Sequence, residues 1–153
     1  MTDRQPSAQG RVVIDTNVWI SAALAPGGPP ALVVRRVLAD GQPVMCAETF
    51  SELSSRLWRP KFDRYLSLEA RQAILHDLAA VAHWVELTRE VRATRYSRDP
   101  DDDKFVQAAL VSQASWLVSG DPDLLVLGAV GPLRTATPAE ALADPRFLRP
   151  AST

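Results

Sequence analysis

Carboxylate side chains at four separated places in the chain are the residues best suited to chemistry. Asp15 follows a short apolar run, and Asp121 follows another such run much later in the sequence. Between them lie the pair Glu48 and Glu52 and the cluster Asp101-Asp102-Asp103. Hard divalent cations take oxygen ligands, and carboxylates from separated segments are what a Mg²⁺ site needs. Ions held in this way would activate water and stabilise negative charge on phosphate oxygens, which suits phosphodiester hydrolysis.

Two of these acidic groups also have an explanation that involves no chemistry. The cluster 101–103 falls in the first turn of an expected helix, where acids interact favourably with the helix dipole. Glu48 and Glu52 are four residues apart, a spacing that is typical of a solvated helix face. The residues alone therefore leave open which acid of each group is functional. The combination of all four groups favours a metal site, because a cation between repelling carboxylates makes their proximity tolerable.

Strands and helices alternate along the chain and determine where these acids lie. Apolar runs predict strands at 11–14, 44–46, 84–87, 116–118 and 133–135. Helical spacing predicts helices at 18–24, 31–39, 47–57, 68–83, 101–113 and 137–142, a short helix from Asp121, and an exposed irregular connection over 88–100. This order favours a parallel sheet covered on both faces, which binds ligands beyond the carboxyl ends of its strands. Asp15 and Asp121 should therefore lie at the same edge of the sheet.

Length and composition indicate one domain with nearly balanced charge. The chain has 153 residues, of which 46% are hydrophobic, enough to bury one core. We expect a disordered tail over 1–10, a folded domain over 11–143 and a C-terminal tail over 144–153. The net charge is −1, from 17 basic and 18 acidic residues, so the overall field attracts a polyanion little. A nucleic acid would have to be held by local basic clusters and by metal ions.

The sequence contains no feature that directs the chain to a membrane or an oxidising compartment. Residues 1–10 are polar and lack the apolar core of a signal peptide, and no later stretch is apolar enough to span a bilayer. The single cysteine, Cys46, lies in an apolar run, which favours a buried thiol and excludes an internal disulfide. We therefore expect a cytoplasmic protein with no membrane partner.

Several motifs carry a resemblance to a known family. The run Val12-Val13-Ile14-Asp15-Thr16-Asn17-Val18-Trp19-Ile20-Ser21 resembles the opening motif of PIN-domain proteins. The stretches 99–105 and 118–125 are similar to the family's other acidic segments. The Pro-Gly-Gly loop at 26–28, Glu52-Leu53, Leu57 and Arg59-Pro60-Lys61-Phe62 resemble one subgroup, toxin components of toxin–antitoxin systems. The resemblance extends from about Arg11 to Leu127.

The resemblance implies a three-layer α/β/α sandwich with a mostly parallel central sheet, and RNase activity on single strands that depends on Mg²⁺ or Mn²⁺. By position, it implies that the catalytic and metal-binding quartet is Asp15, Glu52, Asp102 and Asp121. Asn17, Ser119 and Asp123 would be supporting residues. Asn17 would orient Asp15 or a water on the metal, and Ser119 would form a hydrogen bond within the cluster.

Two departures from the family pattern leave alternates for two members of the quartet. Asp103 stands where relatives often carry Asn, so the cluster 101–103 offers several candidates for one role. Asp102 is preferred because Phe105, Ala108 and Ala109 then fall at the expected offsets. Glu48 is the alternate for Glu52, which is preferred because the Arg-Pro-Lys-Phe motif follows it at the expected distance.

Basic residues after Glu52 are candidates for binding RNA or an acidic partner. Arg56, Arg59, Lys61 and Arg64 form a local group, and Lys104 adjoins the acids. A solvated helix end with favourable charge explains the first group equally well. Trp19 and Trp58 could stack on bases, although aromatic residues on apolar faces usually serve packing.

Three functional hypotheses follow. The first is an endoribonuclease toxin that cleaves RNA and is inhibited by a small antitoxin protein covering its acidic groove. The second is a housekeeping nuclease of the same fold that acts on structured RNA or DNA. The third is a non-catalytic module that binds RNA or protein and retains the acids only as part of its fold. The family tendency also suggests a homodimer.

Overall fold

The structure is a computed structural model, and it describes residues 10–148. In this part of the chain, six strands form one sheet in the order β3-β2-β1-β4-β6-β5. Neighbouring strands are parallel except for β5 and β6, which are antiparallel. The strands are β1 (Arg11–Ile14), β2 (Gln42–Met45), β3 (His83–Trp84), β4 (Trp116–Val118), β5 (Ala129–Val130) and β6 (Leu133–Ala136).

Helices connect the strands, and several begin at residues suited to a helix start. Pro29 occupies the first turn of its helix, where the missing N–H has no cost. Ser67 caps the helix after it by accepting a hydrogen bond from the Ala70 amide at 3.0 Å. The helices are α1 (Thr16–Leu24), α2 (Pro29–Asp40), α3 (Ala47–Leu57), α4 (Leu68–Val81), α5 (Arg89–Ala93), α6 (Asp103–Ser112), α7 (Pro122–Leu125) and α8 (Pro138–Ala143), with 3-10 turns η2 (Pro60–Phe62) and η3 (Pro100–Asp102).

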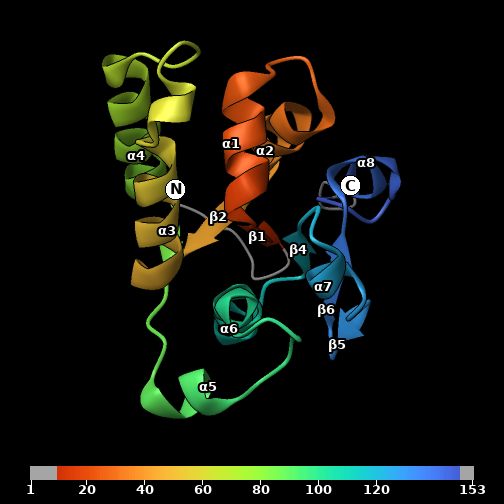
Figure 1. Ribbon diagram of the computed structural model, residues 1–153. Helices are drawn as coiled ribbons and strands as arrows, with labels where there is room; N and C mark the ends of the chain where they lie inside the picture. Colours follow the sequence, from red (N-terminus) through yellow and green to blue (C-terminus); the bar gives the residue numbers. More distant parts are fainter. Residues whose placement is uncertain (1–9, 149–153) are drawn as a thin grey trace, which may run out of the picture.

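Side chains of the central strands alternate between two apolar cores, one on each face of the sheet. In β1, Val12 and Ile14 pack into one core and Val13 into the other. The first core takes its buried helical residues from α1, α2, α3, α4 and α8, and the second from α6 and α7. Figure 1 shows α1 and α2 on one side of the strands and α6 on the other. The predicted three-layer α/β/α sandwich is therefore confirmed.

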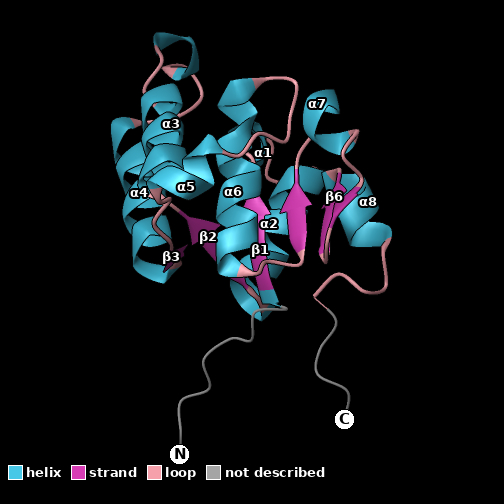
Figure 2. Cartoon of the chain, turned by 90° about the horizontal axis from the view of Figure 1, so that it is seen from below, coloured by secondary structure: helices cyan, strands magenta, loops and turns pink. Residues whose placement is uncertain are grey.

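The two central strands end side by side at one edge of the sheet. Ile14 in β1 pairs with Val118 in β4, and the Asp15 amide continues the ladder by donating to the Val118 carbonyl at 2.9 Å. The Ser119 amide donates in the same way to Ala136, at the end of β6, at 2.9 Å. The arrowheads of the central strands point to this edge in Figure 2. Residues that directly follow β1 and β4 are thereby brought together.

Several predicted boundaries shift by one or two residues, and three predictions differ more from the structure. A strand was expected over 84–87, but the observed strand is His83–Trp84, although the Val85 amide still donates to the Met45 carbonyl at 2.9 Å. The connection expected to be irregular over 88–100 contains α5, and its Ser97 is buried. The antiparallel edge strand β5 was not predicted, because it is only two residues long and depends on pairing with β6.

The packed domain extends beyond residue 143, where the sequence analysis ended it. Phe147 is fully buried and contacts Trp116 edge to face, with 5.4 Å between ring centroids. Arg36 of α2 donates to the Phe147 carbonyl at 2.9 Å, which fixes this segment against the helix. Leu148 is also buried. The rest of the predicted tails, 1–9 and 149–153, lies outside the described residues.

In residues 10–148, none of the helices is both long enough and apolar enough to cross a membrane. Cys46 is buried, as its apolar surroundings predicted.

Candidate active site

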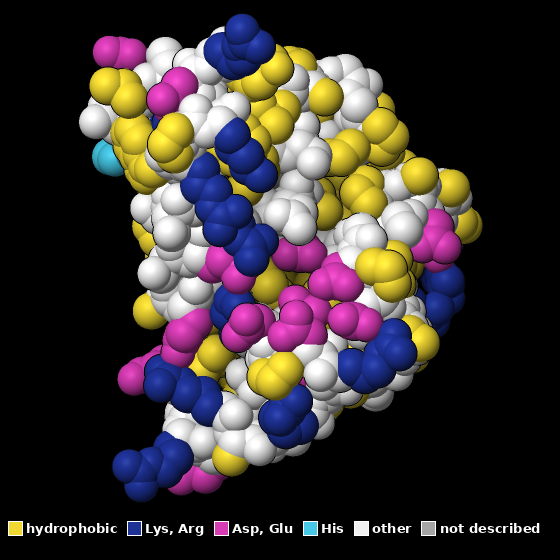
Figure 3. All heavy atoms as spheres, in the orientation of Figure 1, with side chains coloured by type: hydrophobic (Ala, Val, Ile, Leu, Met, Phe, Trp, Pro, Cys, Tyr) yellow, Lys and Arg dark blue, Asp and Glu magenta, His cyan; other side chains and the backbone are white. Residues whose placement is uncertain are grey.

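A small cavity at the carboxyl ends of the central strands collects all four acids of the predicted quartet. Its volume is about 140 Å³. The acids around it come from the β1–α1 junction, from α3, from η3 and from the segment after β4. Figure 3 shows Asp and Glu side chains gathered around a hollow in this face. The lining residues are Asp15, Asn17, Glu52, Arg56, Asp99, Asp101, Asp102, Phe105 and Asp121.

Asp15 is the most buried of these acids, with 4% of its surface exposed. Its Oδ2 accepts a hydrogen bond from the Ser119 hydroxyl at 2.6 Å, and the Ser119 oxygen accepts one from the Asp121 amide at 2.9 Å. Burial raises the pKa of the Asp15 carboxyl, the bond from Ser119 opposes this rise, and the nearby charges of Glu52 and Asp121 add to it. Ser119 thus joins two acids of the predicted quartet.

Asp102 has the clearest sign of an uncompensated charge. Burial raises its pKa to about 7, and its contact with Asp121 and the charges of Asp99 and Asp15 contribute to the rise. The Oδ2 atom of Asp102 is buried and has no hydrogen-bond partner among residues 10–148. An orphaned buried oxygen in a cavity of carboxylates matches what a hard divalent cation requires of its ligands. The residues present therefore fit Mg²⁺ or Mn²⁺.

Glu52 differs from the other acids because cationic side chains already contact it. Its Oε1 accepts from Arg56 at 3.2 Å and from Lys104 at 3.1 Å, and its Oε2 accepts from the Thr16 hydroxyl. Arg56 also donates to the Asn17 side chain at 3.2 Å. In the described part of the chain, no ion pair involves the other three members of the quartet, Asp15, Asp102 and Asp121. Negative charge at the cavity is therefore only partly balanced by the protein.

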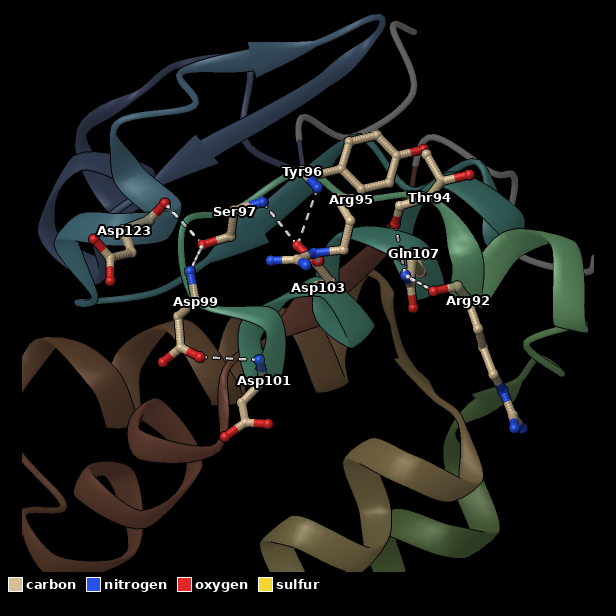
Figure 4. Close-up of polar contacts among 10 residues, drawn as sticks. All are labelled: Arg92, Thr94, Arg95, Tyr96, Ser97, Asp99, Asp101, Asp103, Gln107 and Asp123. Atoms are coloured by element: carbon tan, nitrogen blue, oxygen red, sulfur yellow. Dashed lines mark hydrogen bonds and ion pairs between the residues drawn. The ribbon is translucent and has the colours of Figure 1, made fainter.

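The two alternates, Glu48 and Asp103, do not line the cavity. Glu48 forms an ion pair with Arg92. Asp103 is buried and accepts from Arg95 at 2.8 Å and from the Tyr96 and Ser97 amides at 3.1 and 2.7 Å, as Figure 4 shows. Asp103 therefore fixes the segment before η3, while Asp102 next to it faces the cavity.

Comparison with known proteins gives the family. A family model described as PIN domain matches residues 11–123. This chain belongs to the PIN-domain family. It is 32% identical over 118 residues to MJ1680, an uncharacterized protein of Methanocaldococcus jannaschii, and the match covers 76% of this chain and 74% of that protein.

Solved structures with the same fold include proteins of toxin–antitoxin systems. VapBC2 from Rickettsia felis, bound to a DNA fragment from its promoter, matches with a TM-score of 0.54 and 10% identity over 83% of this chain and 98% of that chain. Mycobacterium tuberculosis VapC20, a sarcin-ricin loop cleaving toxin, matches with a TM-score of 0.53 and 14% identity. The match covers 80% of this chain and 98% of that chain. PAE2754 from Pyrobaculum aerophilum matches with a TM-score of 0.52 and 17% identity, and the match covers 84% of each chain. At these low sequence identities, the likeness shows a shared fold and nothing further.

One acid at the cavity of this PIN domain lies outside all the acidic groups singled out in the sequence. Asp99 lines the cavity, and carboxylate oxygens of Asp99, Asp102 and Asp123 all lie within 4.8 Å of one another. Asp99 was missed because 88–100 was expected to be an exposed connection. The signal that could have indicated it is the Asp-Pro pair at 99–100, which starts the turn into η3. Asp123 lies beside the cavity, where Arg98 donates to it at 2.9 Å.

The predicted basic residues divide into two groups in the PIN domain. Arg56 and Lys104 contact Glu52 at the cavity. Arg59 and Lys61 are exposed in the connection between α3 and α4, and the Lys61 ammonium lies 5.1 Å from the Phe62 ring centroid. In Figure 3 a band of Lys and Arg side chains leads away from the acids over the end of α3.

A larger hollow of the PIN domain lies elsewhere and has different chemistry. It measures about 420 Å³ and is lined mainly by apolar residues of α1, α2 and α4. Asp77 is the one acid among its lining residues. The size of a hollow therefore does not indicate the reactive site here, because metal-assisted chemistry needs the converging carboxylates of the smaller cavity.

Proposed function

We propose that this PIN-domain protein is a metal-dependent endoribonuclease and the toxin of a toxin–antitoxin pair. The observation that carries the proposal is the convergence of Asp15, Asp102 and Asp121 on one cavity, where none of the three forms an ion pair with any cation of residues 10–148. Carboxylates are placed together at such a cost when a divalent cation or a catalytic step compensates for it.

Asp15, Glu52, Asp102 and Asp121 would hold one or more Mg²⁺ or Mn²⁺ ions. When bound, the ions supply an activated water and stabilise charge on the phosphate oxygens. Ser119 orients the carboxylate of Asp15 through its 2.6 Å hydrogen bond. Asp121 is held by its own amide bond to Ser119 and accepts from the Asp123 amide at 2.9 Å. The ligands are therefore fixed by the backbone at the strand ends.

Cations of the protein would help to hold the substrate phosphate. Lys104 and Arg56 contact Glu52 from the rim of the cavity, so their remaining N–H groups can donate to a phosphate oxygen that approaches the acids. Asn17 accepts a hydrogen bond from Arg56 and thereby limits the positions of the guanidinium. We expect Arg56 and Lys104 to offset the repulsion between a phosphodiester and the acids.

RNA as the substrate and a toxin role are supported by the family and by its structural neighbours. VapC20 is a sarcin-ricin loop cleaving toxin, and the Rickettsia felis structure is that of VapBC2 bound to a DNA fragment from its promoter. The motif 59–62 that resembles the toxin subgroup lies in the connection after α3, the helix that carries Glu52 and Arg56 at the cavity. An antitoxin would inhibit by covering the acidic cavity. A homodimer remains a prediction from the family tendency.

The test is cleavage of a mixed RNA preparation with Mn²⁺, Mg²⁺ or EDTA. We expect cleavage with either ion, none with EDTA, and none by Asp15→Asn, which keeps the volume of the side chain. Asp40→Asn is the matched control, because Asp40 is an exposed acid at the end of α2. Cleavage by Asp15→Asn at the rate of the unmodified protein would overturn the site assignment.

Two further results would decide for the other hypotheses. Absence of cleavage with either ion, together with RNA binding, would indicate a non-catalytic binding module. Cleavage without growth arrest on expression, and without a short antitoxin gene beside the coding gene, would indicate a housekeeping nuclease.

A further inference from the structure

The connection between α3 and α4, residues 58–67, carries unpaired positive charge and exposed aromatic rings. Arg59, Lys61 and Arg64 are exposed, and none forms an ion pair with any residue in the described part of the chain. Trp58 and Tyr65 are 37% and 66% exposed. We call residues 58–67 the basic connection. Alternating cations and aromatic rings are the surface that single-stranded nucleic acid prefers, because phosphates and bases alternate along it.

The basic connection is continuous with the acidic cavity. Arg56, in the last turn of α3, contacts Glu52 at the cavity, and the connection begins after Leu57. Figure 3 shows the band of Lys and Arg side chains that starts at the acids and passes over this part of the surface. Because the net charge of the chain is −1, attraction for a polyanion has to come from such a local band.

A buried arginine of α4 fixes the basic connection in place. Arg71 is 1% exposed, donates to Asp63 Oδ1 at 3.0 Å, and lies 5.5 Å from the Trp58 ring centroid. One buried guanidinium thus holds the first residue and the middle of the connection. The Asp63 side chain remains 67% exposed, so the pair does not depend on a deeply buried carboxylate. Asp63 is also the one acid in the connection, and its charge is matched by Arg71.

We propose that the basic connection is a binding track that guides single-stranded RNA into the acidic cavity. Arg59, Lys61 and Arg64 bind phosphates, and Tyr65 and Trp58 stack on unpaired bases. Arg71 is a positioning residue that acts through Asp63 and Trp58. The inference rests on the proposed function, because it assigns the strand-binding surface of that same site. An acidic protein segment would use the cations but has no planar bases to stack on the rings, so RNA is the better fit.

The first test measures binding of a fluorescein-labelled oligouridine in EDTA, where no cleavage is expected, over a range of salt concentrations. One variant carries Arg59→Gln, Lys61→Gln and Arg64→Gln. The control variant carries Arg35→Gln, Arg89→Gln and Arg134→Gln, which removes the same charge from exposed positions outside the basic connection. We expect the first variant to bind at least about tenfold more weakly. The slope of the logarithm of its binding constant against the logarithm of salt concentration should be reduced by about 2, because each phosphate contact to a single strand contributes about 0.7 to this slope. The control variant should show nearly the same binding constant and the same salt dependence as the unmodified protein.

The second test separates positioning from charge. Asp63→Asn removes a negative charge from the basic connection, so electrostatics alone would tighten RNA binding. If Arg71 acts by fixing the connection, the same variant should bind RNA more weakly and, in a cleavage assay, raise KM while kcat is retained. Tyr65→Ala should also raise KM, because stacking contributes to substrate binding and not to the reacting atoms.

Failure of this inference can be distinguished from failure of the proposed function. Equal RNA binding by the two charge variants, in a protein that cleaves RNA, would overturn the track and leave the nuclease assignment intact. That result is also the one expected if the surface serves an acidic protein partner. Tighter or unchanged binding by Asp63→Asn would overturn the positioning role of Arg71.

Discussion

Ser119 and Asp15 are 104 positions apart in the sequence, yet the Ser119 hydroxyl donates to the Asp15 carboxylate at 2.6 Å. The contact exists because β1 and β4 are parallel neighbours whose carboxyl ends coincide. It orients the most buried acid of the cavity, and the same oxygen accepts from the Asp121 amide. A substitution of Ser119 should therefore change the affinity of the cavity for metal ions, although Ser119 is not proposed as a ligand.

We expect Ser119→Ala to lower the affinity for Mn²⁺ by about 10–100-fold, the usual effect of losing a residue that orients a ligand. Loss of the hydrogen bond also raises the pKa of Asp15 further, so more of this carboxyl is protonated. Isothermal titration calorimetry measures the affinity. Ser115→Ala, at the opposite end of β4, is the control and should bind Mn²⁺ as the unmodified protein does. Equal affinities of the two variants would contradict the role of Ser119.

Metal ions should stabilise the fold at the cavity. Ions that bind only the folded protein raise the free energy of unfolding by about 2.7 kcal/mol when their concentration is a hundred times the Kd. We expect Mn²⁺ to raise the melting temperature of the unmodified protein and not that of Asp121→Asn. Thermal melts followed by circular dichroism measure this. A shift of equal size in Asp121→Asn would remove Asp121 from the ligand set.

Without metal, stability should depend on pH through Asp102. The pKa of this carboxyl is about 7 in the folded protein against an ordinary 3.8, so folding takes up a proton between these values. The free energy of unfolding is therefore highest at acidic pH for this group and falls as pH rises from about 4 to 7. Asp15, whose pKa is also raised, acts in the same direction. Urea titrations in EDTA at several pH values test this, and Asp102→Asn should reduce the fall; an unchanged fall would refute the role of Asp102.

Asp102 and Asp103 should respond differently to substitution although they are adjacent. Asp103→Ala leaves the Tyr96 and Ser97 amides without their acceptor, so we expect a loss of about 1–3 kcal/mol for each buried group that stays unpaired. Asp102→Asn should abolish Mn²⁺ binding and leave the metal-free fold as stable or more stable. Urea titration and calorimetry on both variants measure the two effects. The reverse pattern would exchange the roles of the two residues.

Phe147 should be essential for the stability of the domain. Its ring is fully buried against Trp116, so Phe147→Ala should reduce the free energy of unfolding by about 3–5 kcal/mol. Val126→Ala, at an exposed position, is the control and should change stability little. A negligible effect of Phe147→Ala on urea unfolding would mean that residues beyond 143 do not belong to the folded unit.

The sequence by itself determined the layers of the sandwich and one edge of the site. Short continuous apolar runs identified β1 and β4, because strands of a parallel sheet that is covered on both faces bury their side chains on both sides. Asp15 and Asp121 follow those strands closely, so a parallel sheet leaves them at one edge, as observed. The short strand β5 could not be predicted from the sequence, because two residues show no periodicity and the strand forms only by pairing with β6.

Only the tertiary structure decided among neighbouring acids. Glu48 and Glu52 lie on one helix, and Asp102 and Asp103 are adjacent, so sequence spacing cannot state which side chain meets the other elements. Packing of α6 against the segment before it turns Asp103 toward the Tyr96 and Ser97 amides and leaves Asp102 at the cavity. Asp99 also lines the cavity, and its amide donates to the Ser97 hydroxyl, which in turn donates to the Asp123 carbonyl of α7. The chain order supplied the carboxylates, and the contacts between distant segments selected those that face one another.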